Sequence, residues 1–254
     1  GLLAGKLGMI ATIAAVAEAV ATGMADEGVV PIENSLEGSV TSTLDLLIHE
    51  STLAIRRELI LPIEHNLLVK PGTKAEDIQV IYSHPQALAQ CRHFLERCFP
   101  KAQVMAALST AAAVEEVMAG KAQAAIAPRR AAEIYGAQII AHSIQDRGSN
   151  VTRFVILAPT DSPPTGDDKT SIAFTVAHDR PGTLMAVLRE LADRQINLTR
   201  IESRPTRQEL GIYVFLIDFQ GHREQPVVAE ALRAVEEQAF YFRVVGSYAR
   251  FVVS

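Results

Sequence analysis

The stretch Gly28-Val-Val-Pro-Ile-Glu-Asn-Ser-Leu-Glu-Gly-Ser-Val40 indicates both the fold class and a candidate site. Its hydrophobic beginning predicts a short buried strand at residues 28–32. Three polar side chains, Glu33, Asn34 and Ser35, follow directly, and a turn containing glycine comes next. In open α/β sheets, ligands bind in the crevice beyond the carboxyl ends of the strands. We therefore expect these side chains to face a ligand site; the alternative is a surface turn whose polar groups bond only local backbone.

The composition is that of a globular protein without a strong affinity for polyanions. The chain has 254 residues, of which 48% are hydrophobic and 21% charged, which suits one large or two ordinary domains. Its net charge of −5 and its pI of about 5.8 argue against nucleic acid or an anionic membrane as a partner. Residues 1–20 are rich in Ala and Leu, but Glu18 interrupts the apolar run. We therefore predict an amphipathic helix between Thr12 and Gly23 rather than a signal peptide or a membrane span.

The two cysteines, Cys91 and Cys98, lie seven residues apart in one predicted helix. This spacing puts them on the same face but two turns apart, which is too far for a disulfide bond. A structural zinc site needs more ligands than this pair supplies. We interpret them as reduced thiols, in or near the core of a cytoplasmic protein.

Up to residue 158, helix-like and strand-like stretches alternate. Strands are expected near residues 28–32, 53–58, 63–69, 78–82, 104–107, 124–127, 139–141 and 152–157, and helices near 40–49, 85–98, 110–119 and 129–135. Such alternation is typical of βαβ units, so we expect an α/β fold with a mainly parallel sheet.

The string Pro159-Thr-Asp-Ser-Pro-Pro-Thr-Gly-Asp-Asp-Lys169 has the composition of a linker. After it, strands are expected at 171–177, 198–203, 211–219 and 241–251, and helices at 182–194 and 226–238. This βαββαβ order is the ferredoxin-like pattern. The predicted organisation is therefore a first domain at residues 1–158, a linker at 159–169 and a second domain at 170–254.

Two further strings place polar residues at strand ends. Ser83-His-Pro-Gln86 follows a predicted strand and opens a helix, whose first free amides form an anion site with Ser83. Gln90 lies about a turn and a half into this helix. His84 is more simply explained as a helix cap or a packed ring than as a general base. The string Asn150-Val-Thr-Arg-Phe154 lies at another predicted strand, where an exposed strand entry is the simplest explanation.

Together, the strings at residues 28–40, 83–86 and 150–154 resemble the signature of prephenate dehydratases, the enzymes that form phenylpyruvate on the route to phenylalanine. The resemblance implies a catalytic domain of two α/β lobes around a cleft, as in periplasmic binding proteins. It also implies a lyase that needs no cofactor, and no phosphate loop, metal cluster or dinucleotide fingerprint occurs in the sequence.

The resemblance assigns catalysis to Thr152. A threonine hydroxyl is a weak acid, so we expect it to donate a placed hydrogen bond to the departing hydroxyl of the substrate. Glu33 supplies the proton instead if burial raises its pKa, and the sequence leaves this choice open. The guanidinium group of Arg153 can donate two parallel hydrogen bonds to a substrate carboxylate, so we expect Arg153 to hold that group. The expected substrate-binding residues are Asn34, Ser35, Ser83, Gln90, Arg153 and Phe154.

The second domain resembles the ACT regulatory domains attached to prephenate dehydratases. The strings that carry this likeness are Asp179-Arg-Pro-Gly-Thr-Leu184, Asn197-Leu198 and Ile201-Glu-Ser-Arg-Pro205. The resemblance implies feedback inhibition by L-phenylalanine and pairing into a homodimer or homotetramer. The expected effector-binding residues are Pro181, Gly182, Thr183, Leu184, Asn197, Leu198, Glu202, Ser203, Arg204 and Pro205.

The beginning of the chain departs from the family pattern. Family members open with a strand and a glycine-rich loop, and Gly1-Leu-Leu-Ala-Gly-Lys-Leu-Gly-Met9 does not match them. We expect this N-terminus to be truncated or divergent. Two alternative functions stay open: an arogenate dehydratase, and an amino-acid-binding regulatory protein without catalysis.

Overall fold

The chain folds into two compact units. The structure, a computed structural model, describes residues 12–148, 150–176, 181–206 and 212–251. One unit contains Gly1–Leu61 together with Thr152–Ser254, and the other contains Pro62–Val151. We call the second one the central unit. No helix in the described part of the chain is long and apolar enough to cross a membrane.

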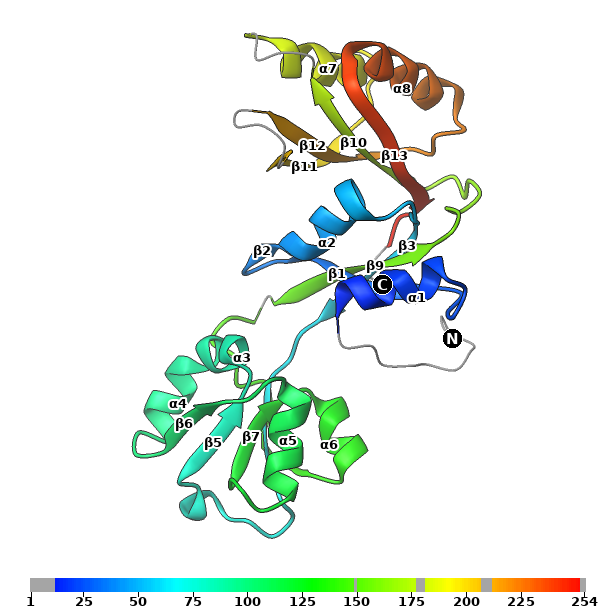
Figure 1. Ribbon diagram of the computed structural model, residues 1–254. Helices are drawn as coiled ribbons and strands as arrows, with labels where there is room; N and C mark the ends of the chain where they lie inside the picture. Colours follow the sequence, from blue (N-terminus) through cyan, green and yellow to red (C-terminus); the bar gives the residue numbers. More distant parts are fainter. Residues whose placement is uncertain (1–11, 149, 177–180, 207–211, 252–254) are drawn as a thin grey trace. The chain divides into compact units, whose positions relative to one another are not determined.

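Within the first unit, the N-terminal lobe is built on a four-stranded sheet in the order β2-β1-β9-β3 (Figure 1). Its strands are β1 (Gly28–Asn34), β2 (Gly38–Ser39), β3 (Ala54–Pro62) and β9 (Val151–Ala158). Helix α1 (Ile13–Ala21) begins at Thr12, whose hydroxyl accepts a hydrogen bond from the Ala15 amide, so the predicted cap is confirmed. Helix α1 packs so closely on β1 that a Cβ atom at Gly28 would lie 2.6 Å from Val16.

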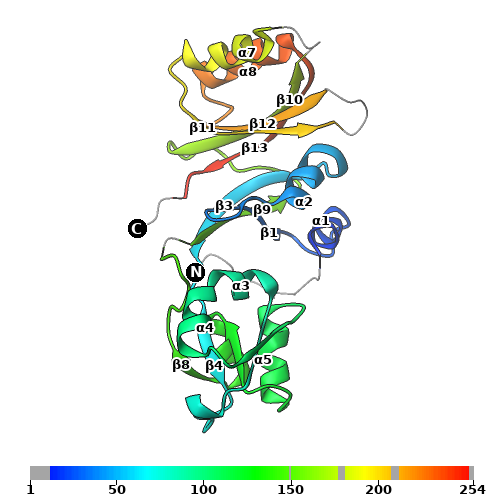
Figure 2. The ribbon, with the colours of Figure 1, turned by 90° about the vertical axis from the view of Figure 1, so that its left-hand side faces the viewer.

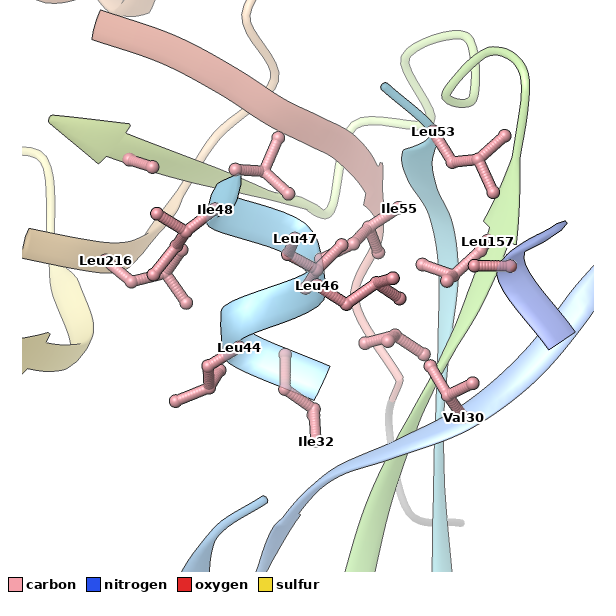
Figure 3. Close-up of a cluster of buried hydrophobic side chains, with 14 of the residues drawn as sticks. Val30, Ile32, Leu44, Leu46, Leu47, Ile48, Leu53, Ile55, Leu157 and Leu216 are labelled. Atoms are coloured by element: carbon pink, nitrogen blue, oxygen red, sulfur yellow. The ribbon is translucent and has the colours of Figure 1, made fainter. Parts of the chain in front are cut away.

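The helix predicted at residues 40–49 consists of two segments. Helix α2 (Thr41–Asp45) continues directly into the π-helical turn η1 (Leu46–Glu50). Their side chains fill the core shared by the N-terminal lobe and the C-terminal sheet (Figure 3). The buried residues of these segments that take part are Leu44, Leu46, Leu47 and Ile48.

The C-terminal domain has the βαββαβ order that the sequence predicts. Its elements are β10 (Asp168–Val176), α7 (Thr183–Ala192), β11 (Leu198–Pro205), β12 (Tyr213–Gln220), α8 (Pro226–Gln238) and β13 (Ala239–Ala249). The sheet order is β11-β12-β10-β13, and the pairings are antiparallel.

The C-terminal sheet is covered on both faces. Helices α7 and α8 cover one face and share a core with Phe174 and Phe219 (Figure 1). Side chains from the other face, including Leu216 and Tyr248, belong to the core of the N-terminal lobe. The approach is so close that a Cβ atom at Gly246 would lie 2.2 Å from the carbonyl oxygen of Ile55. Only glycine fits at this position.

The predicted linker is hydrogen-bonded to a strand on each side. Ser162 Oγ donates to the Arg56 carbonyl of β3, and the Ser162 amide donates to the Ser247 carbonyl of β13, 3.1 Å away. Strand β10 begins at Asp168, inside the segment that composition indicates as linker.

The central unit is a five-stranded sheet in the order β6-β5-β7-β4-β8. Figure 2 labels its strands β4 and β8, which lie side by side. Its strands are β4 (Asn66–Val69), β5 (Val80–Ser83), β6 (Gln103–Ala106), β7 (Ala124–Ala127) and β8 (Gln138–Ala141). Its helices are η2 (Ala75–Asp77), α3 (Pro85–Gln90), α4 (Arg92–Cys98), α5 (Thr110–Met118) and α6 (Arg129–Tyr135).

The expectation of a mainly parallel sheet is wrong. Only β5 pairs in parallel fashion, with β6 and β7, whereas β4 runs antiparallel to both β7 and β8. In the N-terminal lobe, β9 runs antiparallel to β1. The βαβ rule applies to consecutive strands joined by a helix, and β4 and β9 are instead the strands by which the chain passes between its two units.

The single helix predicted at residues 85–98 is interrupted at Cys91, where ψ is 17°. Cys91 is buried, but Cys98 is exposed, so only the first is a core residue. Both thiols are free, as predicted.

Candidate active site

The pairing of β1 with β9 brings two expected site residues together. Asn34 lies opposite Thr152 in the register of the two strands, and Asn34 Nδ2 donates a hydrogen bond of 2.8 Å to Thr152 Oγ1. Both side chains are more than nine-tenths buried. Residues 118 positions apart in sequence therefore form one polar pair.

The orientation of the Asn34 amide follows from its second set of contacts. Its Oδ1 accepts from the backbone amides of Leu36 at 2.9 Å and Glu37 at 3.2 Å. The oxygen must face these donors, so the NH2 group faces Thr152. Thr152 Oγ1 is thus the acceptor, and its own proton is not used in this bond.

A β-bulge sets which side chains share a face. Pro31 pairs with Phe154 and Glu33 with Arg153, so Ile32 is the extra residue on β1. Without it, strict alternation would give Asn34 the same face as Ile32, which lies in the hydrophobic core. The bulge turns Asn34 toward Thr152 and leaves Glu33 beside Arg153.

Arg153 lies in a buried group that we call the Arg153 cluster. Its members are Arg153, Glu58, Lys169, Ser171, Asp218 and Tyr248, each 9% exposed or less. Arg153 donates from Nε to Glu58 (2.8 Å), from Nη1 to Asp218 (2.6 Å) and from Nη2 to the Tyr248 hydroxyl (2.9 Å). Each guanidinium nitrogen thus has a protein acceptor, which is not the arrangement that the expected substrate-carboxylate clamp requires.

Ion pairing sets the charge states within this cluster. Burial opposes the charge of Arg153, but Tyr248, Asp218 and Glu58 outweigh it and raise the pKa of the guanidinium. Burial likewise opposes ionisation of Asp218, but Arg153, Arg200 and the Ser171 hydroxyl bring its pKa below the ordinary value. Burial raises the pKa of Tyr248, so its hydroxyl stays protonated.

Glu33 is not buried as the expected proton donor would have to be. Its side chain is 41% exposed, and its carboxylate lies 3.9 Å from Arg153 Nη1 and 3.6 Å from Arg200 Nε. Glu33 therefore lies between a residue of the N-terminal lobe and a residue of the C-terminal domain.

The central unit has a polar group of its own, which we call the Gln90 cluster (Gln90, His65 and Asn150). Gln90 Oε1 accepts from Asn150 Nδ2 and bonds His65 Nε2, both at 2.8 Å. With an oxygen as acceptor, the His65 ring carries its proton on Nε2. Its buried Nδ1 has no hydrogen-bond partner among the described residues.

Sequence reasoning missed His65 as a member of this group. The residues Glu64-His65-Asn66 form a polar run just before a hydrophobic strand, the same signal that Glu33 and Asn34 give at the end of β1. A polar run at the entry of a strand deserves the same weight as one at its exit.

The other expected substrate residues have varied surroundings. Ser83 is fully buried, and its hydroxyl donates to the Ile126 carbonyl at 2.6 Å. Ser35 is exposed, and Phe154 is half-buried. His84 caps helix α3, with Nδ1 accepting from the Gln86 amide at 3.3 Å, which is the helix-cap interpretation.

The expected effector residues lie at the start of α7 and along β11. Asp179 and Arg180 of the same string fall outside the described residues. Gly182 has φ of +92°, a conformation that favours glycine, and open space surrounds it. Glu202 and Arg204 contact the N-terminal lobe: Glu202 accepts from Ser39 Oγ at 2.7 Å, and Arg204 lies 3.2 Å from Asp45.

Among the described residues, no group of three or more His, Cys, Asp or Glu side chains is arranged to hold a metal ion.

Comparisons with known proteins divide the chain near the predicted linker. A family model described as prephenate dehydratase matches residues 4–162, and one described as ACT domain matches residues 170–237. The chain belongs to the prephenate dehydratase family. A solved structure of prephenate dehydratase in complex with L-Phe, from Arthrobacter aurescens, has 41% identity and a TM-score of 0.86, with 95% of this chain and 80% of that one covered.

Two other relatives of this family member carry different descriptions. The bifunctional chorismate mutase/prephenate dehydratase of Aquifex aeolicus is 44% identical over 90% of this chain, and this chain spans 62% of its length. A solved structure of GqqA, described as a novel type of quorum quenching acylases, has 33% identity and a TM-score of 0.84, covering 94% of this chain and 87% of that one.

Proposed function

We propose that this protein converts prephenate to phenylpyruvate by removing the ring hydroxyl and a carboxylate, the reaction for which its family is named. The Asn34–Thr152 pair carries the proposal. An amide fixed by two backbone donors holds a threonine oxygen 2.8 Å away, and the proton of that threonine remains available to a ligand.

The chemistry asks little of the protein beyond placed hydrogen bonds. Aromatisation of the ring drives the loss of water and carbon dioxide, and the departing hydroxyl must gain a proton or a strong hydrogen bond. We assign this donor role to Thr152, because its hydroxyl proton is not used in the bond to Asn34, whereas the Glu33 side chain is 41% exposed and its carboxylate faces Arg153 and Arg200. We further propose that Asn34, Ser35, Ser83, Gln90 and Phe154 bind the substrate.

The test is direct. The protein is incubated with prephenate, and phenylpyruvate is followed by its absorbance in alkali; Thr152→Val, which keeps the shape but loses the hydroxyl, is the matched control. Turnover by the wild type and not by the variant supports the proposal. Turnover of arogenate alone would move the assignment to arogenate dehydratase, and turnover of neither compound would contradict it. An acylated quorum-sensing signal, offered in parallel, tests the activity for which the GqqA structure is named.

We also propose that L-phenylalanine inhibits the enzyme by binding the C-terminal domain at the α7 and β11 residues named above. Gly182, with its positive φ and open surroundings, leaves room for a ligand close to the backbone. Calorimetric titration with phenylalanine on the wild type and on Gly182→Val tests this, and absence of heat in the wild type would contradict it. We place the enzyme in the cytoplasm as a homodimer or homotetramer, for which light scattering is the measurement.

A further inference from the structure

Strand β9 presents two consecutive side chains to different surroundings. Thr152 lies on the face of Asn34, whereas Arg153, Val155 and Leu157 lie on the face that packs against the C-terminal domain. One peptide unit therefore separates the assigned catalytic hydroxyl from an arginine held by another domain.

Four hydrogen bonds close a ring through Arg153. Arg153 Nη1 donates to Asp218 at 2.6 Å, and the other oxygen of Asp218 accepts from Ser171 Oγ at 2.6 Å. The Ser171 and Tyr248 hydroxyls are 2.7 Å apart, and Tyr248 accepts from Arg153 Nη2 at 2.9 Å. Since Ser171 gives its proton to Asp218, Tyr248 must donate to Ser171, so every proton of the ring has one position.

The ring is also balanced in charge. Outside it, Arg153 Nε donates to Glu58, which Lys169 Nζ contacts at 2.8 Å. Two cations thus face two carboxylates in a buried site. Removing one member leaves an uncompensated buried group, so this geometry resists small displacements of any single strand.

The ring joins β9 to the sheet that carries the expected effector residues. Asp218 lies on β12 opposite Arg200 of β11, and Tyr248 lies on β13. Strand β11 also carries Glu202, which bonds Ser39 of the N-terminal lobe. A shift of β11 and β12 would therefore act on Asp218 and, through it, on Arg153.

We propose that Arg153 is a positioning residue, a role that presupposes the proposed function: through Asp218 and Tyr248 it makes the placement of the Thr152 hydroxyl depend on the C-terminal domain. Arg153 does not itself contact the substrate in this assignment, because its three nitrogens are used within the protein. The C-terminal domain thereby contributes to catalysis even without an effector.

The full chain allows a matched pair of variants on neighbouring residues of β13. Tyr248→Phe removes one buried hydroxyl from the ring and keeps the packing of the aromatic side chain. Ser247→Ala also removes a buried hydroxyl, but its partners are the Thr170 hydroxyl at 2.8 Å and the Arg223 amide at 3.3 Å, both outside the Arg153 cluster. The unfolding midpoint of both variants is measured first, and kinetics are recorded well below the lower one.

We expect Tyr248→Phe to lower kcat for prephenate by about tenfold with KM within about twofold of the wild type, since only the transition-state donor is misplaced. Ser247→Ala keeps both constants within about twofold. Equal kcat in the two variants, or a fall in kcat matched by an equal rise in KM, would overturn the inference.

A second measurement separates this inference from the proposed function. Amide hydrogen exchange at residues 151–155 is compared in the same three proteins, and we expect faster exchange in Tyr248→Phe alone. If the wild type does not turn over prephenate, the proposed function fails, and the exchange result still decides whether the ring holds the backbone at Thr152. Equal exchange in both variants would contradict the positioning role.

Discussion

The Arg153 cluster and the Gln90 cluster are built from different chemistry. The Arg153 cluster pairs two cations with two carboxylates and places each proton in a closed ring. The Gln90 cluster consists of two amides and an imidazole, and the buried Nδ1 of its His65 has no partner among the described residues. Buried charge enforces one geometry, whereas the Nδ1 atom of His65 keeps hydrogen-bonding capacity that a ligand can use. We infer that the first group holds the scaffold and that the second serves binding.

The largest expected effect comes from breaking the charged group. Arg153→Met keeps much of the side-chain volume but leaves Lys169, which pairs with Glu58, as the one cation of the cluster. Breaking a buried pair costs about 3–5 kcal/mol, so we expect a loss of this size in the free energy of unfolding. Denaturant titration measures it. Arg92→Met, which removes an exposed ion pair with Glu96, is the control and should leave the midpoint unchanged; equal effects would mean that the cluster contributes no more than a surface pair.

Thr152→Ala tests the opposite face of β9, where we expect the main effect to be on catalysis. We expect kcat to fall by about 10²-fold or more, roughly 3 kcal/mol in the activation free energy, as for loss of one transition-state donor. The protein should stay folded, with a loss of about 1–3 kcal/mol in the free energy of unfolding because the buried Asn34 Nδ2 loses its Thr152 acceptor. Thr152→Ser keeps a hydroxyl beside Asn34 and is the matched control. Turnover of the alanine variant within about threefold of the wild type would remove Thr152 from catalysis.

The sequence predicts the surroundings of the two faces of β9 only where the contacts are local in sequence. Caps and strand cores follow local rules, and accordingly the Thr12 cap and the helix Pro226–Gln238 lie where the sequence indicates. The prediction that Asn34 and Thr152 share a site came from a family resemblance, and the hydrogen bond between them agrees with it. The bulge at Ile32 that makes this possible follows Pro31, and a proline inside a strand favours a bulge, but this signal alone does not fix which residue is the extra one.

Arg153 shows why contacts between strands distant in sequence could not be predicted. Its partners Asp218 and Tyr248 lie 65 and 95 residues further along the chain, on strands whose local sequence indicates only a hydrophobic sheet. An arginine next to a catalytic threonine looks like a substrate ligand until the domain that packs against it is known. The mixed sheets were missed for a related reason, because β4 and β9 connect two units rather than consecutive βαβ repeats.

The Gln90 cluster should respond to substitution less strongly than the Arg153 cluster. Gln90→Leu leaves the donors of His65 and Asn150 without their shared acceptor, which costs about 1–3 kcal/mol in stability for unsatisfied buried groups. Gln90→Glu keeps an acceptor oxygen and should be milder. If the role in binding is correct, both variants raise KM for prephenate more than they lower kcat. A larger loss of stability than in Arg153→Met would reverse the ranking of the two clusters.

The dependence of stability on low pH should also differ between the clusters, because only the Arg153 cluster contains carboxylates. Burial opposes the charge of Asp218, but Arg153 and its other partners bring its pKa below the ordinary value, so the unfolded chain binds the proton first. The resulting stability is fully present above the unfolded pKa of about 3.9 and is lost as pH falls through the folded value. Asp218→Asn should therefore flatten the dependence of unfolding free energy on pH below about pH 4. An unchanged slope would show that Asp218 does not carry its charge in the folded protein.

The smallest effect is expected at the cysteines of the central unit, one buried in its core and one on its surface. Burial, with a further contribution from Asp146, raises the pKa of the Cys91 thiol to about 12, so almost none of it is thiolate at pH 8. Cys98 is exposed and is open to reagent. Iodoacetamide at pH 8 should therefore modify the native protein once, at Cys98, with turnover unchanged, and mass spectrometry should find no label on native Cys98→Ala. Unfolding in denaturant would then make Cys91 reactive as well. Labelling of Cys91 without denaturant would mean that the break between α3 and α4 opens in the native state and that the Gln90 cluster next to it is less firmly held than its hydrogen bonds indicate.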